Sequence, residues 1–286
     1  MSELLDPKLV RELAASIDLR PTKQRGQNFV TDANTVRRIV RKAQIGPDDI
    51  VLEVGPGLGS LTLGLLSTGA QVTAIEIDER LAGLLPATVE RLQPDAKDRL
   101  RVVTSDALDV TELPGPEPTA VVANLPYNVS VPVLLTLLER FPSWDRGLVM
   151  VQLEVANRLV AEPGSKIYGV PSVKLAWYCD AELAGLVPPK VFWPVPNVDS
   201  GLVRLTRREP PATTAERKQV FALVDAAFNQ RRKMLRSSLN KFFGSSARAA
   251  ETLQAAGIPE TARGEALRVQ DFAALAEQIG ANNEGD

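Results

Sequence analysis

A strand-type run that ends in a glycine-rich loop is the feature that most constrains the fold of this chain. Residues 50–54 (IVLEV) are apolar and rich in β-branched side chains, residues 55–59 contain three glycines, and residues 60–69 carry apolar side chains at helical spacing. Glycine permits positive φ angles and lets a ligand approach the backbone closely. The segment therefore predicts a strand, a tight loop and a helix whose N-terminus is open to a nucleotide-like ligand.

Further runs of the same kind follow along the chain, at residues 71–78, 100–105, 119–124 and 146–153. The segments between them, such as 79–92, are long enough for the crossover helices that parallel strands require. We therefore expect an α/β fold in which a Rossmann-like, mostly parallel sheet is flanked by helices. Two later runs, 181–188 and 200–207, are close enough in sequence to form an antiparallel pair at one edge of that sheet.

The sequence changes character after Arg208. The next stretch, EPPATTAE, resembles a linker, and a long helical pattern runs from Ala215 to Phe243. We therefore expect two domains, residues 1–208 and a helical domain of residues 209–286, with a boundary near residue 208.

Composition limits the compartment and the chemistry. The 286 residues include 44% apolar ones, enough for a full-sized core, yet no run approaches the roughly 20 apolar residues of a membrane span. The first residues lack the apolar core of an export signal, so a cytoplasmic protein is expected. The sequence has no histidine and one cysteine, Cys179, which excludes disulfide scaffolds, ordinary zinc sites and imidazole catalysis. Cys179 lies among apolar neighbours, which favours a buried, inert thiol over a reactive one.

The glycine loop favours one class of nucleotide. A dinucleotide fingerprint would have glycine at position 60, where this chain has Ser60, and the G-x-G-x-G spacing is more typical of adenosylmethionine-binding proteins. Glu76 ends the next strand, where a carboxylate can accept both ribose hydroxyl protons. Capping of the next helix is the alternative for Glu76, and Asp78 would serve that purpose equally well. Asp106 ends the third strand, where it can accept from an adenine amino group or cap a helix.

The sequence Asn124-Leu125-Pro126-Tyr127, at the end of the fourth strand, indicates chemistry on an exocyclic amine of adenine or cytosine. Such an amine is a poor nucleophile because its lone pair is delocalised into the ring, so an enzyme must hold both N–H hydrogens. The Asn124 side-chain oxygen and the Leu125 carbonyl can accept them, Pro126 stiffens the turn, and Tyr127 can stack on the base. This scheme requires no general base and no metal, because the methylated ammonium can lose its proton to water. The alternative is an Asn–Pro turn with Tyr127 packed in the core.

Basic residues gather in two stretches although the net charge is −2. Residues 204–241 contain ten basic and three acidic side chains, and residues 20–42 contain seven and one. Solvated helix faces would explain either stretch, but the two flank the predicted base pocket in sequence, which favours RNA phosphate contacts. Because an adenine paired in a duplex cannot reach the methyl group of a bound adenosylmethionine, the target is expected to be an unstacked or loop nucleotide.

These motifs resemble the KsgA/RsmA family of ribosomal RNA adenine dimethyltransferases, whose relatives include the Erm methylases. The resemblance covers nearly the whole chain and rests on GQNFVTD (26–32), EVGPGLGSLT (53–62), EID (76–78), SDAL (105–108), NLPYNVS (124–130), VFWPVPNVDSGLVRL (191–205) and FNQRRKMLRSSL (228–239). It implies a class I methyltransferase domain with a mostly parallel seven-stranded sheet and a small C-terminal helical domain. It also implies adenosylmethionine-dependent N6,N6-dimethylation of two adjacent adenines in the 3′-terminal hairpin loop of 16S ribosomal RNA, coupled to small-subunit maturation.

Carried over position by position, the resemblance assigns roles to individual residues. The cofactor-binding set is Gln27, Asn28, Val30, Gly55, Gly57, Glu76, Asp106 and Asn124. Phe29 would help Gln27 to close that pocket, and Val30 stands where the family usually has leucine. Phe192 resembles the second aromatic, which sandwiches the target adenine opposite Tyr127, although a core aromatic is the alternative. The residues expected to contact RNA, on a helix, are Arg231, Arg232, Lys233 and Arg236.

The resemblance also implies a partner, the pre-30S particle, for a chain that acts as a monomer without membrane contact. Three other functions remain open from the residues. An Erm-like enzyme would act on large-subunit RNA, and the FNQRRKMLRSSL segment favours the small subunit instead. A ribosome-assembly checkpoint factor would depend on binding more than on methylation. A nicotinamide-dependent oxidoreductase is supported only by the glycine loop and Glu76.

Overall fold

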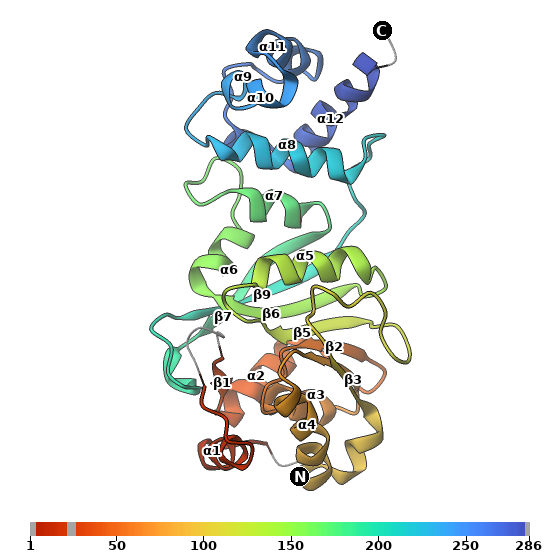
Figure 1. Ribbon diagram of the computed structural model, residues 1–286, viewed down its shortest axis with the longest axis vertical. Helices are drawn as coiled ribbons and strands as arrows, with labels where there is room; N and C mark the ends of the chain where they lie inside the picture. Colours follow the sequence, from red (N-terminus) through yellow and green to blue (C-terminus); the bar gives the residue numbers. More distant parts are fainter. Residues whose placement is uncertain (1–3, 22–26, 284–286) are drawn as a thin grey trace. The chain divides into compact units, whose positions relative to one another are not determined.

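The computed structural model describes residues 4–21 and 27–283, and it divides into two compact units (Figure 1). Unit 1 contains the chain up to Ala156 together with Ala181–Arg207, and unit 2 contains Asn157–Asp180 together with the residues from Arg208 onward. One junction therefore falls at the boundary expected near residue 208, and a 24-residue segment before it groups with the C-terminal residues. The assignment of separate functions to residues 1–208 and 209–286 stays a prediction.

A seven-stranded sheet forms the core of unit 1, in the order β4-β3-β2-β5-β6-β9-β7. Its strands are β2 (Ile50–Val54), β3 (Gln71–Glu76), β4 (Leu100–Thr104), β5 (Ala120–Asn124), β6 (Arg146–Gln152), β7 (Cys179–Val187) and β9 (Ser200–Arg207). The pairings from β4 to β6 are parallel, and β9 pairs antiparallel with β6. The predicted mostly parallel sheet is confirmed, and β7 and β9 are neighbours at its edge.

The order of the strands places a switch point beside β2. The chain proceeds from β2 outward to β3 and β4, and then returns to β5 on the other side of β2. In open α/β sheets, ligands bind outside the carboxyl ends of the strands at such a point. The loop after β2 and the residue that ends β5, Asn124, therefore lie at the same edge of the sheet.

Helices accompany the strands as the crossover argument requires. They are α1 (Pro7–Ser16), α2 (Ala33–Ala43), α3 (Ser60–Leu66), α4 (Glu79–Leu92), α5 (Ser130–Arg140) and α6 (Leu153–Leu159), with short 3₁₀ turns at Pro94–Arg99 and Pro189–Val191. The predicted helix 79–92 is confirmed as α4. It begins after Asp78, whose side chain accepts from the Arg80 N–H and so caps the helix.

A two-stranded ladder joins the N-terminal segment to a distant loop. Strand β1 (Phe29–Val30) pairs antiparallel with β8 (Phe192–Trp193), with Val30 opposite Phe192. The Thr31 N–H donates to the Val191 carbonyl at 2.8 Å, which extends the ladder by one bond. Residues about 160 positions apart in sequence are thereby held side by side.

Unit 2 corrects the prediction of one long helix from Ala215 to Phe243. Its helices are α7 (Val170–Ala176), α8 (Arg217–Asn229), α9 (Leu235–Ser238), α10 (Asn240–Phe243), α11 (Ser246–Ala255) and α12 (Val269–Asn283), with a 3₁₀ turn at Gly264–Ala266. The buried face of α8 ends with Ala227, and the polar run 229–233 offers no apolar face that a continuing helix could bury. The chain turns instead, and the Leu235 N–H donates to the Ala262 carbonyl at 2.7 Å.

Two further expectations concern the surface and the core. Within residues 4–21 and 27–283, every helix falls short of the length and apolarity that crossing a bilayer requires. Cys179 is 2% exposed, so the predicted burial of its thiol is confirmed.

Candidate functional site

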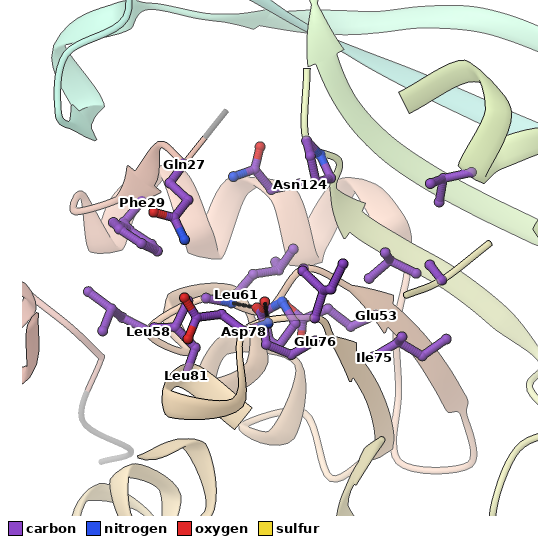
Figure 2. Close-up of a pocket in the computed structure, with 18 of the residues that line it drawn as sticks. Gln27, Phe29, Glu53, Leu58, Leu61, Ile75, Glu76, Asp78, Leu81 and Asn124 are labelled. Carbon is purple, nitrogen blue, oxygen red and sulfur yellow. Dashed lines mark hydrogen bonds between the residues drawn. The ribbon is translucent and has the colours of Figure 1, made fainter. Parts of the chain in front are cut away.

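A cavity of about 490 Å³ lies at the carboxyl ends of β2, β3, β4 and β5, a volume in the range of small-molecule sites. In Figure 2, Asn124 lies on one side of this space, Glu76 and Asp78 lie on the other, and Gln27 and Phe29 close one end. The lining includes the whole set predicted to bind the cofactor, namely Gln27, Asn28, Val30, Gly55, Gly57, Glu76, Asp106 and Asn124.

The loop after β2 has a backbone that glycine alone adopts without strain. The φ angles of Gly55, Gly57 and Gly59 are +69°, +58° and +93°. A Cβ at Gly57 would also lie 2.7 Å from the Phe29 ring. At the next position, the Ser60 hydroxyl donates to the Val30 carbonyl at 2.5 Å. The serine that departs from the dinucleotide fingerprint therefore ties the loop to the N-terminal segment of the cavity wall.

Glu76 is held at the end of β3 by backbone N–H groups. Its Oε2 accepts from the Gly57 N–H at 3.1 Å and its Oε1 from the Asp78 N–H at 3.0 Å. Burial raises the pKa of Glu76, and these two hydrogen bonds oppose the rise. Because Asp78 caps α4, the alternative that Glu76 serves as the helix cap is excluded. A carboxylate offers about four lone-pair sites, so acceptor capacity remains for a hydroxyl donor in the cavity.

The orientation of the Asn124 amide is fixed by a backbone carbonyl. Its Nδ2 donates to the carbonyl oxygen of Asn28 at 3.0 Å. A carbonyl can only accept, so this partner assigns the nitrogen to that side and leaves Oδ1 on the other as an acceptor. The sequence reasoning named the Asn124 oxygen as an acceptor but missed the group that orients it.

The predicted aromatic pair lies outside the cavity lining. Tyr127 is half-buried, and its hydroxyl lies 2.7 Å from the Ser200 Oγ. Burial raises the pKa of this phenol. Phe192 is 2% exposed within β8, while its neighbour Trp193 contacts the ring of Phe29 with 6.2 Å between ring centres. The sandwich of an adenine between Tyr127 and Phe192 stays a prediction, as does the part of Leu125, which is also buried.

Sequence reasoning missed an apolar residue that lines the cavity next to Glu76. Ile77 is 66% exposed and lines the cavity between two carboxyl side chains. A large aliphatic side chain left open beside Glu76 offers a flat base an apolar surface. The signal was present in EID, where an isoleucine at a strand end follows the predicted ribose ligand. Asp106 also lines the cavity, and its Oδ1 accepts from the Leu108 N–H at 2.9 Å, which leaves Oδ2 for a ligand.

The charge of the cavity selects between the candidate cofactors. Four carboxyl groups line it, on Glu53, Glu76, Asp78 and Asp106, and the described lining residues include no lysine or arginine. Such a site favours the sulfonium and ammonium groups of adenosylmethionine and disfavours the pyrophosphate of a dinucleotide. The residues present fit adenosylmethionine, which argues against the oxidoreductase alternative. Among the described residues, no three or more carboxylates or thiols are grouped to hold a metal ion.

The burial of Glu53 leads to a prediction about how the stability of the fold depends on pH. Glu53 is fully buried at the end of β2 and accepts one hydrogen bond, from the Thr62 hydroxyl to Oε2 at 2.7 Å. Burial raises the pKa of Glu53 from its ordinary 4.5 to about 8. Because the folded-state value is the higher one, the stability that Glu53 contributes is complete below about pH 4.5 and is lost as the pH rises to about 8.

Glu53→Gln should therefore match the wild type in free energy of unfolding near pH 4 and exceed it near pH 9 by several kcal/mol. Urea unfolding curves at a series of pH values measure this difference. Parallel curves for the two proteins across that range would contradict a raised pKa.

The predicted RNA contacts of unit 2 divide into two kinds. Arg231 donates from Nε to Glu265 at 3.0 Å and from Nη2 to the Ser165 carbonyl at 3.1 Å, and Arg236 pairs with Glu260 at 3.3 Å. Arg232 and Lys233 are exposed on the turn after α8 rather than on the helix we expected. Arg232 and Lys233 are therefore the better placed of the four to meet phosphates.

The other basic stretch, residues 20–42, is described in part. Lys23 and Arg25 lie outside the described residues. The remaining bases after them are Arg37, Arg38, Arg41 and Lys42 on α2, where Arg38 donates to the Leu186 carbonyl at 2.9 Å. Their contact with RNA stays a prediction.

The chain is also similar in sequence to known proteins. The family model described as "Ribosomal RNA adenine dimethylase" matches residues 19–280. The ribosomal RNA small subunit methyltransferase A of Streptomyces griseus is 65% identical over 275 residues, which cover 96% of this chain and 94% of that protein. The protein of the same name from Cutibacterium acnes is 64% identical over 286 residues, with 98% and 96% covered.

Two solved structures share the fold. A dimethyladenosine transferase from Plasmodium falciparum superposes with a TM-score of 0.73 at 24% identity, over 90% of this chain and 98% of that one. The 23S rRNA methyltransferase ErmE superposes with a TM-score of 0.62 at 30% identity, over 88% and 100%.

Proposed function

The chain belongs to the ribosomal RNA adenine dimethylase family, and from that membership we propose that it methylates N6 of two adjacent adenines in the 3′-terminal hairpin loop of 16S ribosomal RNA. It is an adenosylmethionine-dependent enzyme that modifies ribosomal RNA. The observation that carries the proposal is the fixed orientation of Asn124, whose Oδ1 is left as an acceptor at the edge of the cofactor cavity.

Adenosylmethionine supplies a methyl group that its sulfonium already activates. Glu76 would hold the ribose hydroxyls and Asp106 the adenine amine, while the glycine loop admits the cofactor close to the backbone. The Asn124 Oδ1 and the Leu125 carbonyl would accept the two N6 hydrogens of the target base, which draws its nitrogen toward tetrahedral geometry. Alignment and pre-arranged dipoles then lower the barrier without a protein base.

The small subunit is favoured over the large one. The curated relatives that are 60–65% identical carry the name of small-subunit methyltransferases, whereas the large-subunit enzyme ErmE is 30% identical. We therefore propose 16S RNA within a pre-30S particle as the substrate, bound by a cytoplasmic monomer. Tyr127 and Phe192 would hold a base that has left its stack, as chemistry on a base requires.

The test uses purified protein, labelled adenosylmethionine, and small subunits that lack the modification. Two labelled adjacent adenines in the 3′-terminal hairpin loop, each with two methyl groups, are the expected result. Large subunits and free 23S RNA serve as the comparison substrates. Label that appears only on 23S RNA, or at other positions of 16S RNA, would refute the proposed substrate.

The exposed bases on the turn after α8 lead to a prediction about RNA affinity. We expect the double variant Arg232→Gln/Lys233→Gln to weaken RNA binding and to reduce the slope of log K against log salt by about 1.4, since each single-strand phosphate contact contributes about 0.7. Titrations of RNA affinity at several salt concentrations measure that slope. The matched control is Lys218→Gln/Arg248→Gln, which removes two exposed charges of the same unit outside the turn. Equal slopes for wild type and the turn variant would return Arg232 and Lys233 to a solvated surface.

A further inference from the structure

The hydroxyl group of Tyr127 has a partner that stacking on a base does not require. It lies 2.7 Å from the Oγ of Ser200, the first residue of β9, whose side chain is completely buried. A phenylalanine ring would offer a base the same aromatic face, so stacking alone does not account for the hydroxyl. The contact with Ser200 therefore points to a second part for the tyrosine.

Ser200 is held in place by the backbone of the sheet. It lies opposite Gln152 in the antiparallel ladder between β6 and β9. Beside that pair, the Leu153 N–H donates to the Asp199 carbonyl at 2.9 Å, which continues the pairing beyond the end of β9. The Ser200 hydroxyl is thus a fixed point at the edge of the parallel part of the sheet.

The backbone of Tyr127 is fixed as well, but that leaves its ring free to rotate. The Val129 N–H donates to the Pro126 carbonyl at 3.2 Å, so Tyr127 lies within a tight turn. A turn restricts φ and ψ, whereas the side chain of a half-buried tyrosine can still choose among rotamers. The bond from its far end to Ser200 selects one of them.

The segment that carries Ser200 also carries the second predicted aromatic residue. Phe192 begins β8 and Ser200 begins β9, so residues 192–200 connect the two strands. Phe192 is itself 2% exposed and paired with Val30 in the short ladder. The hydroxyl bond therefore ties Tyr127 to the segment that contains the ring assigned to the opposite face of the adenine.

We propose that Ser200 is a positioning residue for the target adenine: its hydroxyl holds the Tyr127 ring in the orientation that receives the base. Ser200 acts through Tyr127, and the described lining of the cofactor cavity contains neither residue. A ring that is ordered before the base arrives need not be ordered during binding of the base, which lowers the cost of that step. The inference rests on the proposed methylation, because it requires Tyr127 to hold the target base.

Single-turnover methyl transfer to unmethylated small subunits tests the proposal. At saturating subunits and adenosylmethionine, Ser200→Ala should slow transfer by about fivefold, the order expected when one side chain must be ordered during the reaction. The Kd values for subunits and for adenosylmethionine should stay level, an outcome that general damage to the fold would not give. The matched control is Thr88→Val, which removes a buried hydroxyl that donates to the Leu84 carbonyl in α4 and should leave the rate unchanged.

A double-mutant cycle shows whether Ser200 acts through Tyr127. Tyr127→Phe removes the same bond from its other end and should also slow transfer by about fivefold. The double variant should be no slower than either single one, because the bond is lost only once, whereas independent effects would multiply to about 25-fold. Tyr127→Phe leaves the buried Ser200 hydroxyl without its partner, so it should unfold at a lower temperature than the double variant.

Three outcomes would overturn the inference: a wild-type rate in folded Ser200→Ala, a wild-type rate in Tyr127→Phe, or multiplying effects in the double variant. If Ser200→Ala does not fold, Tyr127→Phe decides alone, since it leaves β9 unchanged. Failure of the proposed function would be recognised separately, because the wild type itself would then transfer no methyl group to small subunits.

Discussion

Asn124→Ala should lower the rate of methyl transfer by about 10³-fold while leaving the binding of small subunits unchanged. The variant removes Oδ1, one of two acceptors that hold the N6 hydrogens, and loss of one pre-arranged dipole in an active site costs about 10²–10³ in rate. It keeps the backbone at the end of β5, so the Kd for adenosylmethionine should change by no more than a few-fold. Single-turnover transfer to unmethylated subunits and calorimetry with the cofactor measure the two effects separately.

Asn124→Asp is the matched control for the orientation of the amide. An aspartate supplies acceptor oxygens but cannot donate to the Asn28 carbonyl, so two oxygens would face each other where a 3.0 Å hydrogen bond now lies. We expect activity between those of the wild type and Asn124→Ala. Full activity in Asn124→Asp would contradict the part assigned to the Asn28 carbonyl.

The same alanine variant separates catalysis from an assembly role. If the chain acts chiefly as a checkpoint on immature subunits, cells that carry Asn124→Ala should assemble ribosomes normally while cells without the protein do not. Sedimentation profiles of the two strains make this comparison. Assembly defects of equal size in both strains would mean that methylation itself is what matters.

Glu76→Ala should weaken adenosylmethionine binding by about 100-fold. The carboxylate of Glu76 is expected to accept two ribose hydroxyls, and a hydrogen bond to a charged group contributes about 1.5–3 kcal/mol. A loss of about 3 kcal/mol corresponds to a hundredfold rise in Kd. Calorimetric titration measures it, and an unchanged Kd would remove Glu76 from the site.

Asp78→Ala is the control that shows whether Glu76→Ala acts by disrupting the cavity wall instead of by removing ribose contacts. Asp78 lines the same cavity, but its side chain caps α4, so its removal should cost about 1 kcal/mol of stability and little cofactor affinity. Glu76 also accepts hydrogen bonds from the N–H groups of Gly57 and Asp78. These two N–H groups lose their acceptor in Glu76→Ala, and that loss is part of the effect of the variant. Equal rises in Kd for both variants would indicate general disruption of the cavity rather than lost ribose contacts.

The sheet and the cofactor loop could be predicted because their signals are local. Parallel strands buried on both faces are continuous apolar runs, so β2, β3 and β5 are visible in the sequence. The strand–loop–helix unit itself sets the spacing in sequence between the glycine loop and Glu76. That spacing does not depend on any tertiary contact. The cavity lining therefore agreed with the predicted cofactor residues.

What could not be predicted depends on contacts between distant segments. The partner of Asn124 is a main-chain oxygen 96 residues away, and a carbonyl has no residue type to recognise. After the end of α8, the Leu235 N–H bonds to the Ala262 carbonyl, a contact between separate segments that a helical pattern does not contain. The grouping of residues 157–180 with the C-terminal unit likewise has no local signature.

The ladder between β1 and β8 has a mechanical consequence for the two substrates. Val30, on the cofactor cavity, and Phe192, the ring assigned to the target base, are direct partners across it. The hydrogen bond from the Thr31 N–H to the Val191 carbonyl lies beside this pair, so we expect Val30 and Phe192 to move together. A shift of the cavity segment that contains Val30 should therefore be transmitted to Phe192, the ring assigned to the target base.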